Sequence, residues 1–370
     1  MRGLVSLAVS GIVVLFLGAQ PSFSQGSLAP PGPPAPMMKT LDQVEPRVPI
    51  TNLPWTVSAS GSYYLTTNLV GAAGTNGIMV FADHVTIDLR GFALLGGGGA
   101  GCGIVVSNQH VNLRVCNGTI ANWPAQGVLA QNASNSQFEQ LRLSQNGSAG
   151  LQVGVACAVS ACVAEGNGGS GIDTSGGCLI LGCNSCSNFT GFSVMGSCRI
   201  SDCVASANTS NGILVAGVGC SLNGCAVTMN GQDGINAGSG CRIDVCTVLI
   251  NDRHGIITGD GCTIKSCTSN GNGVDGISVG SSCWVNGNMA NGNGTAGIRP
   301  AGNSRVDDNN VYGNFLGIVC TLNGNNFVAR NTARGNAAAD YSIAAGNKNA
   351  QVLAPGAGFI NTDPTANFSY

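Results

Sequence analysis

Three residues with acid–base side chains recur at one position of this 370-residue sequence. Asp233, His254 and Asp275 each stand directly before a Gly and follow one another at a constant interval. If the chain stacks one unit of this length on the next, the three side chains form a row with a step of about 4.8 Å. An imidazole between two carboxylates is held as a cation or acts as an acid. This row, with the adjacent Asp252 and Arg253, is therefore the candidate catalytic site.

Two alternative roles for the row stay open. Carboxylates on one face are ligands that Ca²⁺ prefers, so the row could be a calcium site. Alternatively, the charges occupy solvated turns and only form an exposed polar patch. We expect no other cofactor, and no metal site built from His and Cys, because the chain has only three His.

A second candidate surface combines an aromatic side chain with basic ones. Trp284, Arg242 and Arg305 occupy one position of the same repeat, since whole periods of the repeat separate them. An indole can stack on the apolar face of a sugar ring while neighbouring guanidinium groups donate hydrogen bonds. This strip is the candidate carbohydrate-binding surface.

A repeat of about 21 residues must position these side chains. Its clearest copy, 198–215, runs Cys, four residues, Cys, four residues, Asn and then Gly-Ile. Apolar and polar residues alternate in runs of three to five residues, which indicates short strands with one buried face. Strands this short are stable only when successive coils stack in a parallel sheet. The glycine of the repeat recurs twelve times: Gly77, Gly103, Gly127, Gly150, Gly171, Gly191, Gly212, Gly234, Gly255, Gly276, Gly297 and Gly317.

Stacking would align equivalent residues into columns. Asn tolerates a left-handed turn and its amide can bond the same residue one coil away, which predicts an asparagine ladder. The 17 Cys fall mainly in two columns, for which buried thiols and some disulfide bridges are both open. The predicted columns are Ile200, Leu222, Ile243, Ile264, Val285, Val306; Cys157, Cys178, Cys198, Cys220, Cys241, Cys262, Cys283; Cys162, Cys183, Cys203, Cys225, Cys246, Cys267; and Asn146, Asn167, Asn188, Asn208, Asn230, Asn251, Asn272, Asn293, Asn314.

Composition excludes several classes of protein. A net charge of −2 with 9% charged residues gives no basic surface for nucleic acid. With 57 Gly and only three Glu, a helical repeat is also excluded. These features predict no particular oligomeric state.

The two ends of the chain differ from the repeat. We predict a secretory signal peptide at 1–24, because Arg2 precedes an apolar core and small residues at 22 and 24 mark a cleavage site. A Pro-rich linker at 25–37, an N-terminal cap at 38–70, the solenoid at 71–335 and a C-terminal cap or tail at 336–370 follow. We therefore expect a secreted protein (extracellular, periplasmic or at the cell envelope), with no membrane span after signal cleavage.

The sequence resembles the right-handed parallel β-helix (pectate-lyase-like) superfamily, particularly exported bacterial proteins built from parallel β-helix repeats. The resemblance covers about residues 40–370, and includes Met-Lys-Thr-Leu-Asp-Gln-Val-Glu-Pro-Arg at 38–47 and Ala-Asp-His-Val-Thr-Ile-Asp-Leu-Arg-Gly at 82–91. Together with the repeat it implies an all-β fold. We expect a single-stranded right-handed parallel β-helix of about 12 coils of 20–26 residues, capped at both ends.

Two functions are compatible with this sequence. The favoured one is non-catalytic: an exported β-helix that binds carbohydrate or another surface polymer, or has a structural or adhesive role at the cell envelope. The alternative, implied by the resemblance, is a polysaccharide lyase or glycoside hydrolase that uses the Asp233–His254–Asp275 row. Against it, Arg253-His254-Gly255 lacks the first Gly of the Gly-His-Gly element of polygalacturonases, and Thr263 replaces the Arg of their Arg-Ile-Lys element.

Overall fold

The computed structural model describes residues 45–99, 101–354, 356 and 361–370. The predicted signal peptide (1–24), the linker (25–37) and the start of the N-terminal cap lie outside the described residues. Residues 47–370 form one compact unit of 44 strands, and the described part of the chain has no α-helix. Within those ranges, accordingly, no helix is long and apolar enough to cross a membrane.

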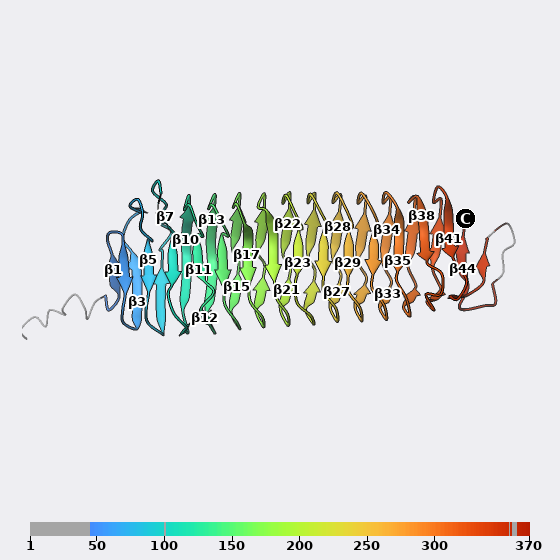
Figure 1. Cartoon of the computed structure of the whole chain (residues 1–370), viewed down its shortest axis with the longest axis horizontal. Coiled ribbons are helices and arrows are strands. Elements are labelled where there is room, and N and C mark those ends of the chain that lie inside the picture. The colour runs from blue at the N-terminus through green and yellow to red at the C-terminus, as the bar shows by residue number, and fades with distance from the viewer. Residues whose placement is uncertain (1–44, 100, 355, 357–360) are drawn as a thin grey trace, which may run out of the picture. The chain divides into compact units, whose positions relative to one another are not determined.

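The compact unit is a right-handed parallel β-solenoid, as the repeat and the resemblance together predict (Figure 1). Each regular coil has three short strands, and every strand pairs in parallel with its equivalent in the next coil. The third strands form a 14-stranded sheet. Its members are β2 (Trp55–Val57), β5 (Ile78–Val80), β8 (Ile104–Val106), β11 (Val128–Ala130), β14 (Leu151–Val153), β17 (Ser170–Thr174), β20 (Thr190–Val194), β23 (Ile213–Val215), β26 (Ile235–Ala237), β29 (Ile256–Thr258), β32 (Ile277–Val279), β35 (Ala296–Pro300), β38 (Leu316–Cys320) and β41 (Ala339–Ile343).

The first and second strands of the coils belong to one 28-stranded sheet. The first strands are β1 (Val48–Ile50), β3 (Gly61–Leu65), β6 (Val85–Asp88), β15 (Ala158–Ser160), β18 (Leu179–Leu181), β21 (Arg199–Ser201), β24 (Ser221–Asn223), β27 (Arg242–Asp244), β30 (Thr263–Lys265), β33 (Trp284–Asn286), β36 (Arg305–Asp307), β39 (Phe327–Ala329) and β42 (Lys348–Asn349). The second strands are β4 (Leu69–Val70), β7 (Ala93–Leu95), β16 (Val163–Glu165), β19 (Asn184–Cys186), β22 (Val204–Ser206), β25 (Ala226–Thr228), β28 (Thr247–Leu249), β31 (Thr268–Asn270), β34 (Met289–Asn291), β37 (Asn310–Tyr312), β40 (Thr332–Arg334), β43 (Val352–Leu353) and β44 (Asn367–Ser369). In two coils both strands are continuous, as β10 (Arg114–Ala121) and β13 (Gln137–Ser144), and β9 (His110–Val111) and β12 (Ala133–Ser134) form an extra pair.

The solenoid has 14 coils, two more than predicted. The additional coils contain β2 and β41, which fall in the segments predicted as caps. Neither carries the repeat glycine, because Pro54 and Asp340 occupy its position. In the inner coils a Cβ at this position would collide with the next coil; at Gly212 it would lie 2.4 Å from the side chain of Val227. β42 and β44 pair with the first and second strands of this last coil, but no described strand pairs with the outer side of β41, so Asp340 is tolerated there.

The corners between strands of the regular coils use left-handed residues. Val245 and Ile250, with φ of 55° each, precede the column residues Cys246 and Asn251. Our expectation that the ladder asparagines themselves adopt the left-handed conformation is therefore wrong. The residue before each of them makes the turn, which leaves the asparagine amide free to point inward and bond neighbouring coils.

The asparagine ladder itself is confirmed. The Oδ1 atom of Asn251 accepts hydrogen bonds from the backbone N–H and the Nδ2 of Asn230, at 3.0 and 2.8 Å. The Nδ2 of Asn251 in turn donates to Oδ1 of Asn272 at 3.0 Å. Each buried amide thus satisfies both its own polar atoms and a backbone group of the preceding coil.

The cysteine columns are ladders of the same kind, built from thiols. The Sγ of Cys262 accepts the backbone N–H of Cys241 at 3.3 Å and donates to the carbonyl of Gly238 at 3.3 Å. Farther along the column, Ser304 Oγ accepts the N–H of Cys283 at 3.0 Å. All 17 Cys lie in the described residues and all are free thiols. Of the two hypotheses for the cysteine columns, buried thiols and disulfide bridges, the structure therefore supports buried thiols.

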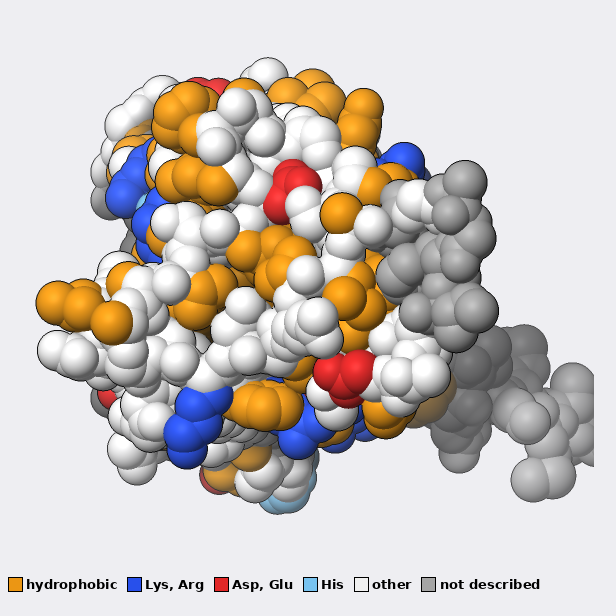
Figure 2. All heavy atoms as spheres, turned by 90° about the vertical axis from the view of Figure 1, so that its right-hand side faces the viewer, with side chains coloured by type: hydrophobic (Ala, Val, Ile, Leu, Met, Phe, Trp, Pro, Cys, Tyr) orange, Lys and Arg blue, Asp and Glu red, His pale blue; other side chains and the backbone are white. Residues whose placement is uncertain are grey.

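The core is a continuous apolar stack inside the coils. The predicted column from Ile200 to Val306 is in register, and its members are fully buried. The early coils have bulkier contents, since Trp123 and Phe138 are also fully buried. At the C-terminal end, apolar side chains are exposed among mostly uncharged ones (Figure 2), consistent with the partial exposure of Tyr341 and Ile343 in the last coil.

Candidate functional site

The constant spacing brings Asp233, His254 and Asp275 together, in the turns before β26, β29 and β32. The backbone N–H of His254 donates to Asp233 Oδ1 at 3.2 Å, and His254 Nδ1 lies 3.6 Å from Asp275 Oδ2. The row inferred from the repeat is therefore present as a contact between neighbouring coils.

The two carboxylates of the row are not exposed, contrary to the interpretation of a solvated patch. Asp233 is 1% exposed and Asp275 is 2% exposed. The reason is that this position caps the next coil: Asp275 Oδ1 accepts the N–H of Ala296 at 2.9 Å, as Asn211 Oδ1 accepts the N–H of Asp233 at 3.1 Å. The row is thus a variant of the polar ladders that join the coils.

Arginine partners neutralise these carboxylates. Arg299 binds both oxygens of Asp275, through Nε at 2.9 Å and Nη2 at 3.2 Å. The half-exposed Arg253 lies 3.9 Å from Asp233 Oδ2, whereas Asp252 is exposed and takes no part. Because a buried charge needs such pairing, the arrangement holds these groups in place and leaves no free carboxylate oxygen on Asp275.

The row also lacks the features of a cation site, and it lines none of three hollows on the surface. Its acidic oxygens are occupied by backbone and arginine donors, and no group of three or more His, Cys, Asp or Glu in the described ranges could hold a metal ion. The hollows found on the surface lie over the early coils and are lined by other residues. His254 Nδ1 is buried without a hydrogen bond, so its ion pair with Asp275 is the only use of that atom among the described residues.

The candidate carbohydrate strip forms a register-aligned column on the outer face of the 28-stranded sheet. Arg242 and Trp284 each pair with Thr263 between them, and Trp284 pairs with Arg305 on its other side. Trp284 is 42% exposed, and the Arg242 and Arg305 side chains are at least half exposed. These three side chains are therefore presented together to solvent.

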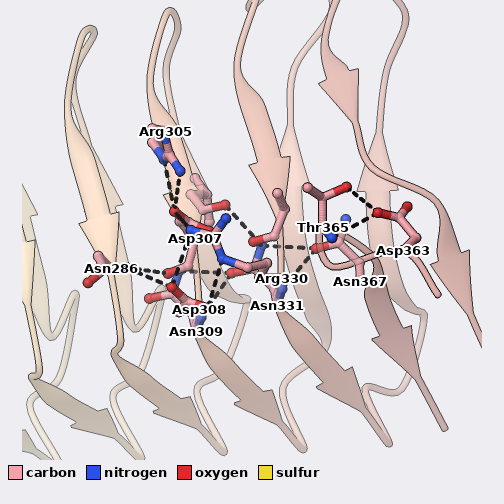
Figure 3. Close-up of polar contacts among 12 residues, drawn as sticks. Asn286, Arg305, Asp307, Asp308, Asn309, Arg330, Asn331, Asp363, Thr365 and Asn367 are labelled. Carbon is pink, nitrogen blue, oxygen red and sulfur yellow. Dashed lines mark hydrogen bonds and ion pairs between the residues drawn. The ribbon is translucent and has the colours of Figure 1, made fainter. Parts of the chain in front are cut away.

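Carboxylates on the same strands orient both arginines. Arg242 bonds Asp244 through Nε, and Arg305 bonds Asp307 Oδ2 at 2.8 Å (Figure 3). Asp307 is 1% exposed, is also bonded by Arg330, and its Oδ1 is buried without a hydrogen bond. Such pairing restricts the rotamers of the two guanidinium groups while leaving part of each exposed.

One further member of this column was not anticipated from the sequence. Phe327 pairs with Arg305 in the next coil, is 38% exposed, and its ring lies 5.5 Å below the Arg305 guanidinium carbon. The sequence spacing could have placed Phe327 in the column, because Phe327 follows Arg305 by the length of one coil. Phe327 lies beyond the last repeat glycine, Gly317, where the glycine spacing no longer marks the coils.

A polar cluster on the early coils was also missed, although 82–91 was singled out for its resemblance. His110 Nδ1 lies 3.0 Å from Asp83 Oδ1, and His84 Nδ1 lies 3.1 Å from Asn112 Nδ2. The separation of Asp83 and His110 along the chain is close to that of the repeat glycines there. That spacing could have revealed the pair, and the cluster holds two of the chain's three histidines.

Comparison with known proteins supports the fold. Residues 102–245 match the family model described as a right handed beta helix region. The A-module of the Azotobacter vinelandii mannuronan C-5 epimerase AlgE4 is similar at a TM-score of 0.50 and 13% identity, over 74% of this chain and 87% of that one. The AlgE6 A-module of the same organism gives 0.46 and 12%, over 82% and 90%. The catalytic domain of a GH87 alpha-1,3-glucanase gives 0.43 and 14%, over 81% and 64%. A search of curated proteins finds no match.

Proposed function

We propose that this right-handed parallel β-helix protein is an exported, non-catalytic polysaccharide-binding protein whose binding face is the column Arg242–Thr263–Trp284–Arg305–Phe327. The single observation that carries the proposal is the alignment of two exposed aromatic rings and two oriented arginines on one flat sheet face.

Spacing along the column suits an extended polymer. Neighbouring coils are about 4.8 Å apart, so Trp284 and Phe327, two coils apart, are separated by roughly 10 Å. A chain lying along the solenoid axis can therefore meet repeated contacts of the same kind. Apolar sugar faces pack on the rings, and hydroxyl or carboxylate groups accept from Arg305 between the rings and from Arg242 two coils before Trp284.

Preorganisation favours binding at this face. Arg305 is held by Asp307 on one side and lies over Phe327 on the other. Ligand binding therefore costs little additional side-chain entropy at Arg305. Because its arginine and tryptophan side chains are all exposed on the outside of one sheet, the face fits a binder that follows a polymer better than an enzyme that encloses one sugar. Export is part of the proposal and rests on the signal sequence predicted at 1–24.

Glycan-array binding by the full-length protein, followed by affinity measurement on the best polysaccharide, tests the proposal. We expect Trp284→Ala to lower affinity about tenfold, because it removes the main stacking surface. Phe189→Ala is the matched control, since Phe189 is an exposed aromatic (56%) outside the column. Equal affinities of Trp284→Ala and the parent protein would rule out this face.

One observation keeps a polysaccharide lyase or hydrolase as a second candidate: His254 lies 3.6 Å from the buried Asp275. Assays for new reducing ends and unsaturated products on the bound polysaccharide separate the two functions. Cleavage that is lost in His254→Gln at unchanged stability would support the enzyme, and binding without cleavage would support the binder.

A further inference from the structure

We infer that the early coils carry a second binding site, for a single neutral saccharide unit, in the hollow between Asp83 and Val155. We call it the N-terminal hollow. It has a volume of about 480 Å³, and its eight lining residues include Asp83, Gln109, Val111, Gln131, Asn132 and Val155. This site is separate from the Trp284 column: it lies seven coils away, roughly 34 Å along the stack.

Longer connections build this hollow. Residues 107–113 join β8 to β10 and 131–136 join β11 to β13, whereas four residues, 238–241, make the same connection in a later coil. The extra residues form the short parallel pair β9–β12, of which Val111, Ala133 and Ser134 line the hollow. The early coils therefore have the insertions that a concave site requires, and that the regular coils lack.

Asp83 supplies a fixed, charged acceptor at the hollow. Its Oδ1 accepts the backbone N–H of Val111 at 2.9 Å and contacts Nδ1 of His110 at 3.0 Å. Its Oδ2 makes no hydrogen bond to any described residue, and the side chain is 47% exposed. The Val111 N–H, followed by the His110 ring, lowers the pKa of Asp83, so its carboxylate is ionised. An ionised carboxylate oxygen accepts strongly from sugar hydroxyls.

Amide side chains complete the polar lining. Gln109 and Gln131 are exposed and their side chains bond no described residue, while Asn132 Nδ2 has only long contacts, 3.4 Å each, to the carbonyls of Val106 and Ser107. Each primary amide offers both donors and an acceptor, which matches the donor–acceptor character of a hydroxyl. The exposed Val155 and the half-exposed Val111 supply apolar contact for the C–H groups of the ring.

Charge selects the class of ligand. Asp83 is the one charged residue among the eight that line the hollow, and no Lys or Arg is among them. An anionic sugar would be repelled by Asp83, and the lining offers no Lys or Arg to compensate, whereas neutral hydroxyls are attracted. His110 Nε2 is buried without a hydrogen bond, so the imidazole contacts Asp83 and does not reach the hollow through that atom. Binding, and not proton transfer, is therefore the inferred role.

Isothermal titration calorimetry of the full-length protein tests this site, with glucose and mannose hexasaccharides as neutral probes and oligogalacturonate as the anionic one. We expect a neutral probe to bind, Asp83→Asn to weaken it at least about tenfold, and Gln131→Ala to weaken it about three- to tenfold. Gln351→Ala, an exposed amide outside the hollow, is the control and leaves the affinity unchanged.

The outcomes distinguish this site from the Trp284 column. Trp284→Ala leaves neutral-probe binding intact if the hollow is responsible, and abolishes it if the column is. Asp83→Asn retains an acceptor for the Val111 N–H, and Gln131→Ala breaks no hydrogen bond, so both variants should fold. The inference is overturned if neither neutral probe binds at about 10 mM, if both variants bind like the parent protein, or if the anionic probe alone binds.

Discussion

The early and later coils of this solenoid share one architecture, but their connections and their surfaces differ. From about residue 157 to 314 the coils are nearly uniform, and Asn, Cys and Ser side chains bond neighbouring coils at their corners. Between residues 83 and 134 the connections lengthen, a histidine–aspartate pair joins two neighbouring connections, and the surface becomes hollow. Regular coils satisfy their backbone groups with the next coil, whereas the N-terminal hollow lies over the early coils. The early coils have longer, less regular connections, and these form the N-terminal hollow that we propose as a binding site.

The largest expected effect comes from breaking the inner stack of the regular coils. Ile243→Asp places a carboxylate without a partner in a fully buried column, so we expect a loss of more than about 4 kcal/mol or failure to fold. Asn223→Asp is the control, since it puts the same side chain on the exposed face of the preceding coil. Thermal and urea denaturation measure both, and an unchanged melting temperature for Ile243→Asp would contradict the register.

A smaller loss is expected from one rung of the asparagine ladder. Asn251→Ala leaves the backbone N–H and the amide of Asn230 without their acceptor in a buried corner, which should cost about 3 kcal/mol. Gln131→Ala, in the N-terminal hollow, removes no hydrogen bond and should change stability by less than about 0.5 kcal/mol. Equal unfolding free energies for the two variants would contradict the claim that the ladder hydrogen bonds stabilise the regular coils more than Gln131 stabilises the early ones.

The smallest expected effect on stability tests the role of the thiols in the cysteine columns. Cys283 accepts the N–H of Cys262 at 3.3 Å, and Ser304 does the same for Cys283 in the next coil. We expect Cys283→Ser to cost less than about 1 kcal/mol, and Cys283→Ala to cost about 1–3 kcal/mol because the N–H of Cys262 loses its acceptor. If urea denaturation shows Cys283→Ala to be more stable than Cys283→Ser, the thiols stabilise the column by apolar packing and not by hydrogen bonds.

The repeat in the sequence determined the register of the solenoid, because side chains one period apart must stack once the strands are parallel. That is why the column from Ile200 to Val306, the Asn ladder and the Asp233–His254–Asp275 row were all placed correctly. Handedness and the all-β class followed from the resemblance and from the short alternating strands.

Tertiary structure alone decided which polar groups are buried and where the surface is hollow. A carboxylate before the repeat glycine looks exposed in the sequence, but Asp275 is buried because Ala296 of the next coil donates its N–H to it. The C-terminal end coil was hidden because the glycine pattern depends on a following third strand, and no described strand pairs with the outer side of β41, where Asp340 lies. The N-terminal hollow arises from longer connections, whose length the sequence records but whose path depends on the β9–β12 pair. Periodicity sets which residues are neighbours, and the bonds between coils decide what those neighbours can do.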